Sequence, residues 1–152
     1  MPSATTRAHA GVSWDEHGLP DLPGGATCVG EWPLPDLRAL TRARHELDAR
    51  LGVHAVPPRD AVERLLLAFE ELASNGVRHG RGAVSVRVVR SPAGWLIDVG
   101  DAAVDRPPVP AVDRDPARGG MGLGLVARLC PAHGWSVSGG SKHVWACLPI
   151  PA

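Results

Sequence analysis

A chain of 152 residues has about the length of one domain, and its 44% of hydrophobic residues allow a sizeable core. Sixteen basic residues balance sixteen acidic ones, so the composition gives no sign of a surface built for nucleic acid or an anionic membrane. No apolar run approaches a membrane span, and the N-terminus lacks the charged-then-apolar pattern of a signal peptide. We therefore expect a cytoplasmic protein that contacts neither nucleic acid nor membrane directly.

The cysteines agree with a cytoplasmic location. Cys28, Cys130 and Cys147 are odd in number, lie far apart and form no CxxC pair, which favours reduced thiols over a disulfide framework. Cys130 and His133 are at most half of a metal site, because the sequence offers no second half. A buried structural cysteine is the favoured interpretation.

The chain is predicted to begin with a loose tail and an edge strand. Residues 1–26 carry proline, glycine and isolated charges without a period, so the tail is expected to end there and one domain to span 27–152. Residues 27–34 predict an edge strand, because Pro33 cannot donate a ladder hydrogen bond.

Two helices are predicted next. The first runs to Gly52, with Asp36 as its N-cap and leucine and alanine at helical spacing. The pair Pro57-Pro58 separates it from a second helix, which begins near Asp60, with that residue or one just before it as the cap, and ends at Gly80.

The second helix carries the first candidate for chemistry. Glu71 and Asn75 are four residues apart, so their side chains stack one turn above the other. A carboxylate and a carboxamide oxygen placed in this way can hold a divalent cation and polarise a hydroxyl beside it. By itself the pair is more typical of a solvated stripe. The apolar residues of the helix recur at steps of three and four and predict one buried face: Val62, Leu65, Leu66, Phe69, Leu72, Ala73 and Val77.

Two strands are predicted after this helix. Residues 83–90 alternate valine with polar residues, and residues 95–99 form the next strand after a short turn. By the same alternation Asp101 points to the face of Trp95 and Val99, where helices should pack.

A long irregular segment at 102–118 predicts a lid or binding loop. It closes on the glycine-rich run 119–125, where backbone N–H groups can approach a phosphate chain closely. A plain hinge is the alternative, and neither a Rossmann GxGxxG nor a Walker A ending is present. A helix to 133–134 should follow, then strands at 135–138 and 143–149 around a turn of four residues.

Taken in order, these features resemble the GHKL (Bergerat-type) ATP-binding fold of histidine-kinase catalytic domains, gyrase-type ATPases and anti-sigma-factor serine kinases. The resemblance covers residues 34–149. It is greatest to the stand-alone anti-sigma-factor kinase-like proteins, whose motifs are similar to the runs at 71–80, 120–126 and 140–145. It implies an α/β (α+β) two-layer sandwich, with a mixed, mostly antiparallel sheet and about three helices on one face.

The same resemblance implies ATP and Mg²⁺ as ligands and assigns roles to the residues. Glu71 would orient or deprotonate the attacking hydroxyl as the catalytic residue. Asn75 would bind the Mg²⁺ that bridges the phosphates, and Asp101 would accept a hydrogen bond from the adenine amino group. The phosphates would be lined by the glycine-rich run: Gly120, Met121, Gly122, Leu123 and Gly124.

The chain departs from the family pattern at two places. The adenine motif of the family commonly reads DxGxG, but Ala103 stands here at the first of those glycines, and alanine adopts left-handed angles less cheaply. The loop after Asp101 is therefore expected to turn differently. Gly76 stands where the family often has alanine, which weakens the helix beside Asn75.

By resemblance, the expected function is an ATP-binding regulator of transcription that acts as a serine/threonine protein kinase. Its partners would be a sigma factor and the anti-sigma antagonist that it phosphorylates, and a homodimer is left open. The alternative is a nucleotide-gated protein-binding module without significant catalysis. Glu71 argues for the enzyme, and the changed adenine motif argues for the module. A histidine-kinase fragment is disfavoured, because no helical hairpin with a phosphoacceptor histidine precedes the domain.

Overall fold

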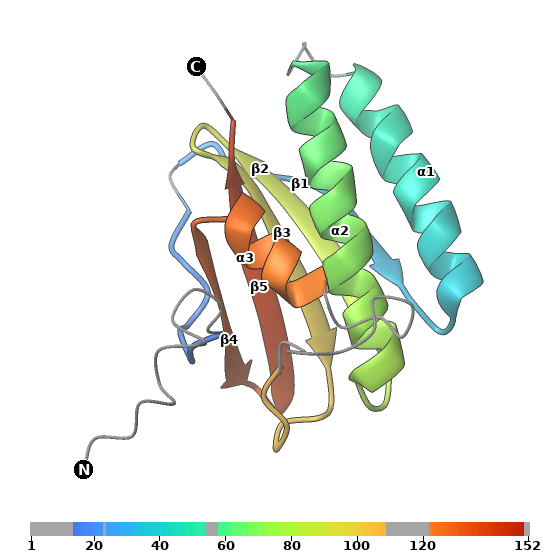
Figure 1. Cartoon of the computed structure of the whole chain (residues 1–152), viewed down its shortest axis with the longest axis vertical. Helices are drawn as coiled ribbons and strands as arrows, with labels where there is room; N and C mark the ends of the chain where they lie inside the picture. The colour runs from blue at the N-terminus through green and yellow to red at the C-terminus, as the bar shows by residue number, and fades with distance from the viewer. Residues whose placement is uncertain (1–13, 23, 54–57, 109–121, 151–152) are drawn as a thin grey trace.

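The computed structural model describes residues 14–22, 24–53, 58–108 and 122–150. In these residues the chain forms five strands and three helices around one sheet (Figure 1). In chain order the elements are β1 (Thr27–Pro33), α1 (Leu37–Val53), α2 (Arg59–His79), β2 (Ser85–Ser91), β3 (Gly94–Asp101), α3 (Gly122–Leu129), β4 (Ala132–Ser138) and β5 (Ser141–Pro149).

The sheet has the strand order β1-β2-β3-β5-β4, and every neighbouring pair in it is antiparallel. The three helices lie on one face of the sheet (Figure 1). The predicted two-layer sandwich is therefore confirmed, and β1 is an edge strand as Pro33 indicated. Short hairpins join two of the four pairs, β2 with β3 and β4 with β5. Gly139 and Gly140 both have positive φ, which suits a tight turn between β4 and β5.

The hairpin turn is shorter than the sequence predicted, and this changes the place of Lys142. The expected turn included Ser141 and Lys142, but both residues belong to β5. Two glycines with φ of 60° and 78° suffice to reverse the chain, so the strand resumes at once. As a result Lys142 stands directly opposite Asp101 of β3.

Side-chain capping sets the start of α1, and strand pairing sets the end of α3. The Asp36 carboxylate accepts a hydrogen bond from the Ala39 backbone N–H at 2.8 Å, which confirms the predicted cap of α1. Among the described residues no side chain caps α2, and Asp60 lies in its first turn instead. Helix α3 ends at Leu129 rather than near 133–134, because β4 pairs with β5 from Ala132 onward.

The main core lies between the helices and the sheet. The predicted apolar face of α2 is buried there, and Trp95, Ile97 and Val99 of β3 meet it from the sheet. Gly76 permits the close contact, because a Cβ at this position would lie 2.6 Å from the Val99 Cγ1 atom. The weakening that glycine causes in a helix is thus offset by closer packing of α2 on β3.

The N-terminal segment 14–22 packs on the domain, although the sequence predicted a loose tail as far as residue 26. The Trp14 indole is 7% exposed and donates a hydrogen bond to the Leu123 carbonyl of α3 at 3.1 Å. The His17 N–H donates to the Trp135 carbonyl at 2.8 Å, and Trp145 Nε1 donates to the His17 carbonyl at 2.9 Å. These contacts pair the segment with edge strand β4.

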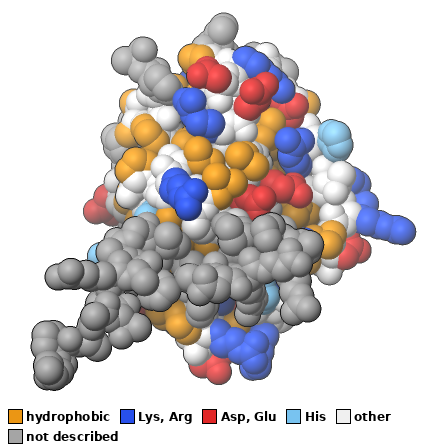
Figure 2. Space-filling model, viewed as in Figure 1, with side chains coloured by type: hydrophobic (Ala, Val, Ile, Leu, Met, Phe, Trp, Pro, Cys, Tyr) orange, Lys and Arg blue, Asp and Glu red, His pale blue; other side chains and the backbone are white. Residues whose placement is uncertain are grey.

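The same segment covers part of the face of the sheet that carries no helices. A second, smaller apolar cluster forms there from Val89, Leu96 and Trp145, with Leu19 and Leu22 packed against it. Side chains of both charges are intermixed over the opposite, helical face (Figure 2). Within the described ranges no helix is long and apolar enough to cross a membrane.

We expect Trp14→Ala to lower the free energy of unfolding by about 3 kcal/mol, because it removes a buried ring and its hydrogen bond to α3. Urea denaturation followed by circular dichroism measures this loss. Val137→Ala is a suitable control, since this β4 side chain is 44% exposed and should change stability by less than about 0.5 kcal/mol. Equal stability of the Trp14 variant and the parent would contradict the docked segment.

Candidate functional site

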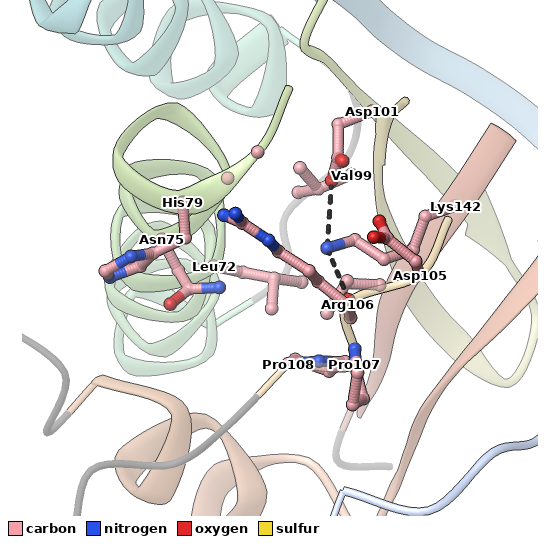
Figure 3. Close-up of a pocket in the computed structure, with 13 residues that line it drawn as sticks. Leu72, Asn75, His79, Val99, Asp101, Asp105, Arg106, Pro107, Pro108 and Lys142 are labelled. Atoms are coloured by element: carbon pink, nitrogen blue, oxygen red, sulfur yellow. Dashed lines mark hydrogen bonds and ion pairs between the residues drawn. The ribbon is translucent and has the colours of Figure 1, made fainter. Parts of the chain in front are cut away.

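A cavity of about 330 Å³ opens at one end of the sandwich, between the C-terminal half of α2 and the ends of β3 and β5 (Figure 3). The first residues after β3 close it on the remaining side. Its volume falls in the range of small-molecule sites, roughly 300–1,000 Å³. The lining residues are Leu72, Asn75, Gly76, His79, Gly80, Val99, Asp101, Asp105, Arg106, Pro107, Pro108, Lys142 and Val144.

Asp101 lies at the end of β3 on the face that the alternation predicted, and it is only 4% exposed. Its Oδ1 atom accepts a hydrogen bond from the Ala103 N–H at 2.6 Å and a longer one from the Arg81 N–H at 3.4 Å. Its Oδ2 atom lies 3.5 Å from Lys142 Nζ. A carboxylate has about four lone-pair positions, so Oδ2 retains acceptor capacity toward the cavity.

The loop after Asp101 turns around Ala103, which stands where the family pattern commonly has glycine. Ala103 is completely buried, its N–H binds the Asp101 carboxylate, and its carbonyl accepts the Arg106 N–H at 3.1 Å. An Asp side chain that accepts the N–H two residues on replaces a backbone turn. The loop thereby holds one oxygen of Asp101 in place and leaves the other facing inward.

Lys142 lines the cavity, although the sequence did not predict it as a site residue. It is the single lysine of the chain, it is 5% exposed, and it forms an ion pair with Asp101 inside the cavity. Its ammonium group also donates a hydrogen bond to the Arg106 carbonyl at 2.9 Å. The sequence holds fifteen arginines and one lysine, so this lysine could have been noticed as unusual. Its position opposite Asp101 depends on the strand register, which the sequence does not reveal.

A second, much smaller hollow joins the cavity along α2. Asn75 and His79 line both spaces, whereas Glu71 lines the small hollow together with Gly122 and Leu123. Glu71 and Asn75 therefore stack on one side of α2, with Asn75 nearer to Asp101. These three predicted residues therefore border two neighbouring hollows, together called the recess, which share Asn75 and His79.

Gly122 is required where Glu71 meets α3. A Cβ at residue 122 would collide with the Glu71 carboxylate and would lie 3.1 Å from its Cβ atom. The helix also starts here, so Gly122 and Gly124 belong to α3 instead of preceding it. Leu123 is buried and held by Trp14, and Gly124 lines neither hollow. Gly120, Met121 and the predicted lid beyond residue 108 lie outside the described residues.

Positive charge faces the cavity from the loop side. The Arg106 side chain runs across the cavity toward α2, and the Lys142 ammonium lies behind it near Asp101 (Figure 3). Arg78 borders the small hollow next to Asn75. Three carboxylates border the same recess, those of Asp101, Asp105 and Glu71, so the recess carries charges of both signs.

The oxygen donors of the recess fit Mg²⁺. Among the described residues no cluster of three or more His, Cys, Asp or Glu side chains is placed to hold a metal. Mg²⁺ does not require such a cluster, because it commonly binds one or two protein oxygens, substrate phosphates and water. The Asn75 amide and the Glu71 carboxylate offer oxygens of this kind next to space for phosphates.

Within the described residues, Cys130 and His133 belong to no group of three or more possible metal ligands. His133 Nδ1 lies 2.8 Å from the Cys130 carbonyl oxygen, and the ring packs on Trp14. Burial raises the pKa of the Cys130 thiol to about 12, with a smaller contribution from Cys147. The thiol is therefore protonated at neutral pH and is a poor metal ligand, as the structural interpretation predicted.

Comparison with known proteins assigns the family. The model of the histidine kinase-like ATPase domain matches residues 34–148, which contain all three helices and four of the five strands. No curated protein matches the chain significantly. The matched region includes Glu71, Asn75 and Asp101. The chain therefore belongs to the histidine kinase-like ATPase family.

Proposed function

We propose that this protein is an ATP-dependent serine/threonine protein kinase of the anti-sigma-factor type, which acts on a partner protein. Because the chain belongs to the histidine kinase-like ATPase family, it is an ATP-binding regulatory protein. The observation that supports kinase activity in particular is the position of Glu71. Its carboxylate lies beside Asn75 and against Gly122, next to the cavity but outside it.

The large cavity suits the base of the nucleotide. The side chains of Leu72, Val99 and Val144 offer apolar contact to a flat ring, and Asp101 is the acceptor at its inner end. An adenine amino group would donate to Asp101 Oδ2, the oxygen that the loop leaves open. Burial makes this acceptor selective, because a ligand without a donor there leaves Oδ2 with only its 3.5 Å contact to Lys142 among the described residues.

The phosphates would extend from the large cavity toward the small hollow at Glu71, Asn75 and Arg78, which by itself has room for about one water molecule. Asn75 would hold Mg²⁺ through its amide oxygen, and the ion would supply charge neutralisation at the phosphates. Arg78 borders this hollow, and its guanidinium group can bind a phosphate in bidentate fashion. Arg106 extends from the opposite side of the cavity. These residues would position the terminal phosphate rather than act as acid or base.

Glu71 is the candidate general base. In the proposed transfer a serine or threonine oxygen of the partner bonds to the γ-phosphorus as the bond between that phosphorus and the ADP oxygen breaks. The hydroxyl proton goes to the Glu71 carboxylate. Because Glu71 lies outside the cavity proposed for adenine, a nucleotide bound there would leave its carboxylate accessible to the hydroxyl of a second protein. Phosphoryl transfer asks mainly for positioning and charge stabilisation, so this small set of groups suffices.

The partner assignment rests on the sequence resemblance. The runs 71–80 and 140–145 are similar to those of anti-sigma-factor kinases, and both border the recess. On that basis we propose a sigma factor and its anti-sigma antagonist as the partners, and the cytoplasm as the location.

A nucleotide-gated binding module is the second candidate. The observation in its favour is that Asp101 already binds its own loop and Lys142, which compete with a base for the carboxylate. In such a module, nucleotide binding would change the conformation of the loop after Asp101. A bound protein would respond to that change, and no phosphate would be transferred.

Glu71 and Asn75 separate the two functions. Glu71→Gln should keep MgATP affinity within about threefold of the parent, whereas phosphate transfer should fall by about 10²–10⁴, the usual cost of a positioned base. Asn75→Ala should lose both, because it removes the proposed metal ligand. Isothermal titration measures affinity, and transfer of labelled phosphate to candidate antagonist proteins encoded beside this gene measures activity.

Glu70→Gln is the matched control for the base. Glu70 is the preceding residue on α2, and it makes only a surface ion pair with Arg44 at 3.9 Å in the described structure. The Glu70→Gln variant should therefore transfer phosphate at the rate of the parent. A parent protein that binds a partner in an ATP-dependent manner and transfers no phosphate would establish the module and overturn the kinase.

Asp101→Asn tests whether Asp101 is the acceptor for the adenine amino group. We expect it to weaken ATP binding at least tenfold and to lower the free energy of unfolding by about 3 kcal/mol, because Lys142 loses its buried counter-charge. Adding Lys142→Met should restore most of the stability and none of the affinity. Thermal unfolding and titration calorimetry measure the two quantities. Recovery of ATP affinity in the double variant would rule out Asp101 as the adenine acceptor.

A further inference from the structure

We propose that Lys142 reads the adenine base directly, by donating a hydrogen bond to the ring nitrogen N1 while the neighbouring amino group donates to Asp101. This inference rests on the proposed function, in which the cavity holds ATP. It adds a residue that determines base specificity and that the sequence placed in a turn.

The burial of Lys142 is the first observation. Lysine is rarely buried to this degree unless its charge is paired, since removing an ammonium group from water is costly. The cost is met by two partners, the Asp101 carboxylate at 3.5 Å and the Arg106 carbonyl at 2.9 Å. Strand register fixes the arrangement, because directly opposite residues of an antiparallel pair project to the same face.

The hydrogen-bonding capacity that remains is the second observation. An ammonium group has three N–H donors, and within the described residues only these two acceptors contact Nζ. The distance to Asp101 also exceeds that of a strong charge-assisted hydrogen bond, about 2.7–2.9 Å. One donor of Lys142 and one oxygen of Asp101 are therefore available side by side, and both residues line the cavity (Figure 3).

A donor beside an acceptor matches one edge of adenine. On that edge the amino group at C6 donates and the adjacent N1 accepts, so Asp101 and Lys142 complement the two atoms in order. Guanine in the same orientation presents an oxygen to the carboxylate and an N–H to the ammonium group, and both contacts repel. The pair therefore selects adenine by attraction and rejects guanine by repulsion.

A structural role for Lys142, as a staple between Asp101 and the loop at Arg106, predicts a different result. A staple would affect all nucleotides equally, because it acts through the shape of the cavity. A direct contact affects only ligands that carry an acceptor at N1. Ligands altered at this single atom therefore separate the two roles.

The experiment measures dissociation constants of the full chain with Mg²⁺ for ATP, 1-deaza-ATP, 7-deaza-ATP and GTP by titration calorimetry. The 1-deaza analogue replaces N1 by a C–H group and should bind about 10- to 100-fold more weakly than ATP, the range for a buried hydrogen bond to a charged group. The 7-deaza analogue is altered on the other ring and should bind within about threefold of ATP. GTP should bind more weakly than 1-deaza-ATP.

The Lys142→Met variant is titrated with ATP and 1-deaza-ATP in the same way, which completes a double-mutant cycle between residue 142 and the N1 position of the ligand. It should bind ATP and 1-deaza-ATP with equal affinity, whereas Arg64→Met, which removes one exposed positive charge near the start of α2, should keep the discrimination. Equal binding of ATP and 1-deaza-ATP by the parent would overturn the direct contact, whether or not the variant folds, and so would tighter binding of GTP. Failure of the parent to bind any of the four nucleotides would overturn the proposed function itself.

Discussion

The distance at which α2 packs on β3 determines the rest of the site. Gly76 gives the helix room to approach Val99. Asn75 directly precedes Gly76 and Asp101 follows Val99 by two residues, so both line the same cavity. A Cβ at residue 76 would push the two elements apart, because Val99 is itself fully buried and has little space to move. The glycine that weakens the helix in isolation therefore sets the width of the recess.

Electrostatics in the recess follow from burial. Asp101 and Lys142 are both almost completely buried, and such pairs commonly contribute little net stability, because desolvation offsets their attraction. Retaining both charges is more easily explained by recognition than by folding. The loop at Ala103 and Arg106 contributes to this arrangement, since its N–H and carbonyl groups bind the carboxylate and the ammonium group and fix their directions.

The N-terminal segment connects the outer face of the sheet to the site. Residues 14–22 cover apolar side chains on the face opposite the helices, and Trp14 reaches α3 beside Gly122. Glu71 meets α3 at that glycine. The position of the candidate base thus depends on contacts from three parts of the chain: the centre of α2, the start of α3 and the segment before β1.

The sequence by itself determined most of the local elements and predicted several of the residues that line the recess. The spacing of apolar residues gave the buried face of α2, Asp36 marked the start of α1, and strand alternation placed Asp101 toward the helices. Local patterns suffice there, because each depends on residues a few positions apart. The tertiary structure decided what lies opposite those residues. Long-range strand register placed Lys142 beside Asp101, pairing with β5 ended α3 early, and docking on β4 ordered a segment that its composition alone describes as a tail. The first and the last of these contacts join residues that are 41 and 118 positions apart, Asp101 with Lys142 and His17 with Trp135, so their energies do not appear in any local pattern.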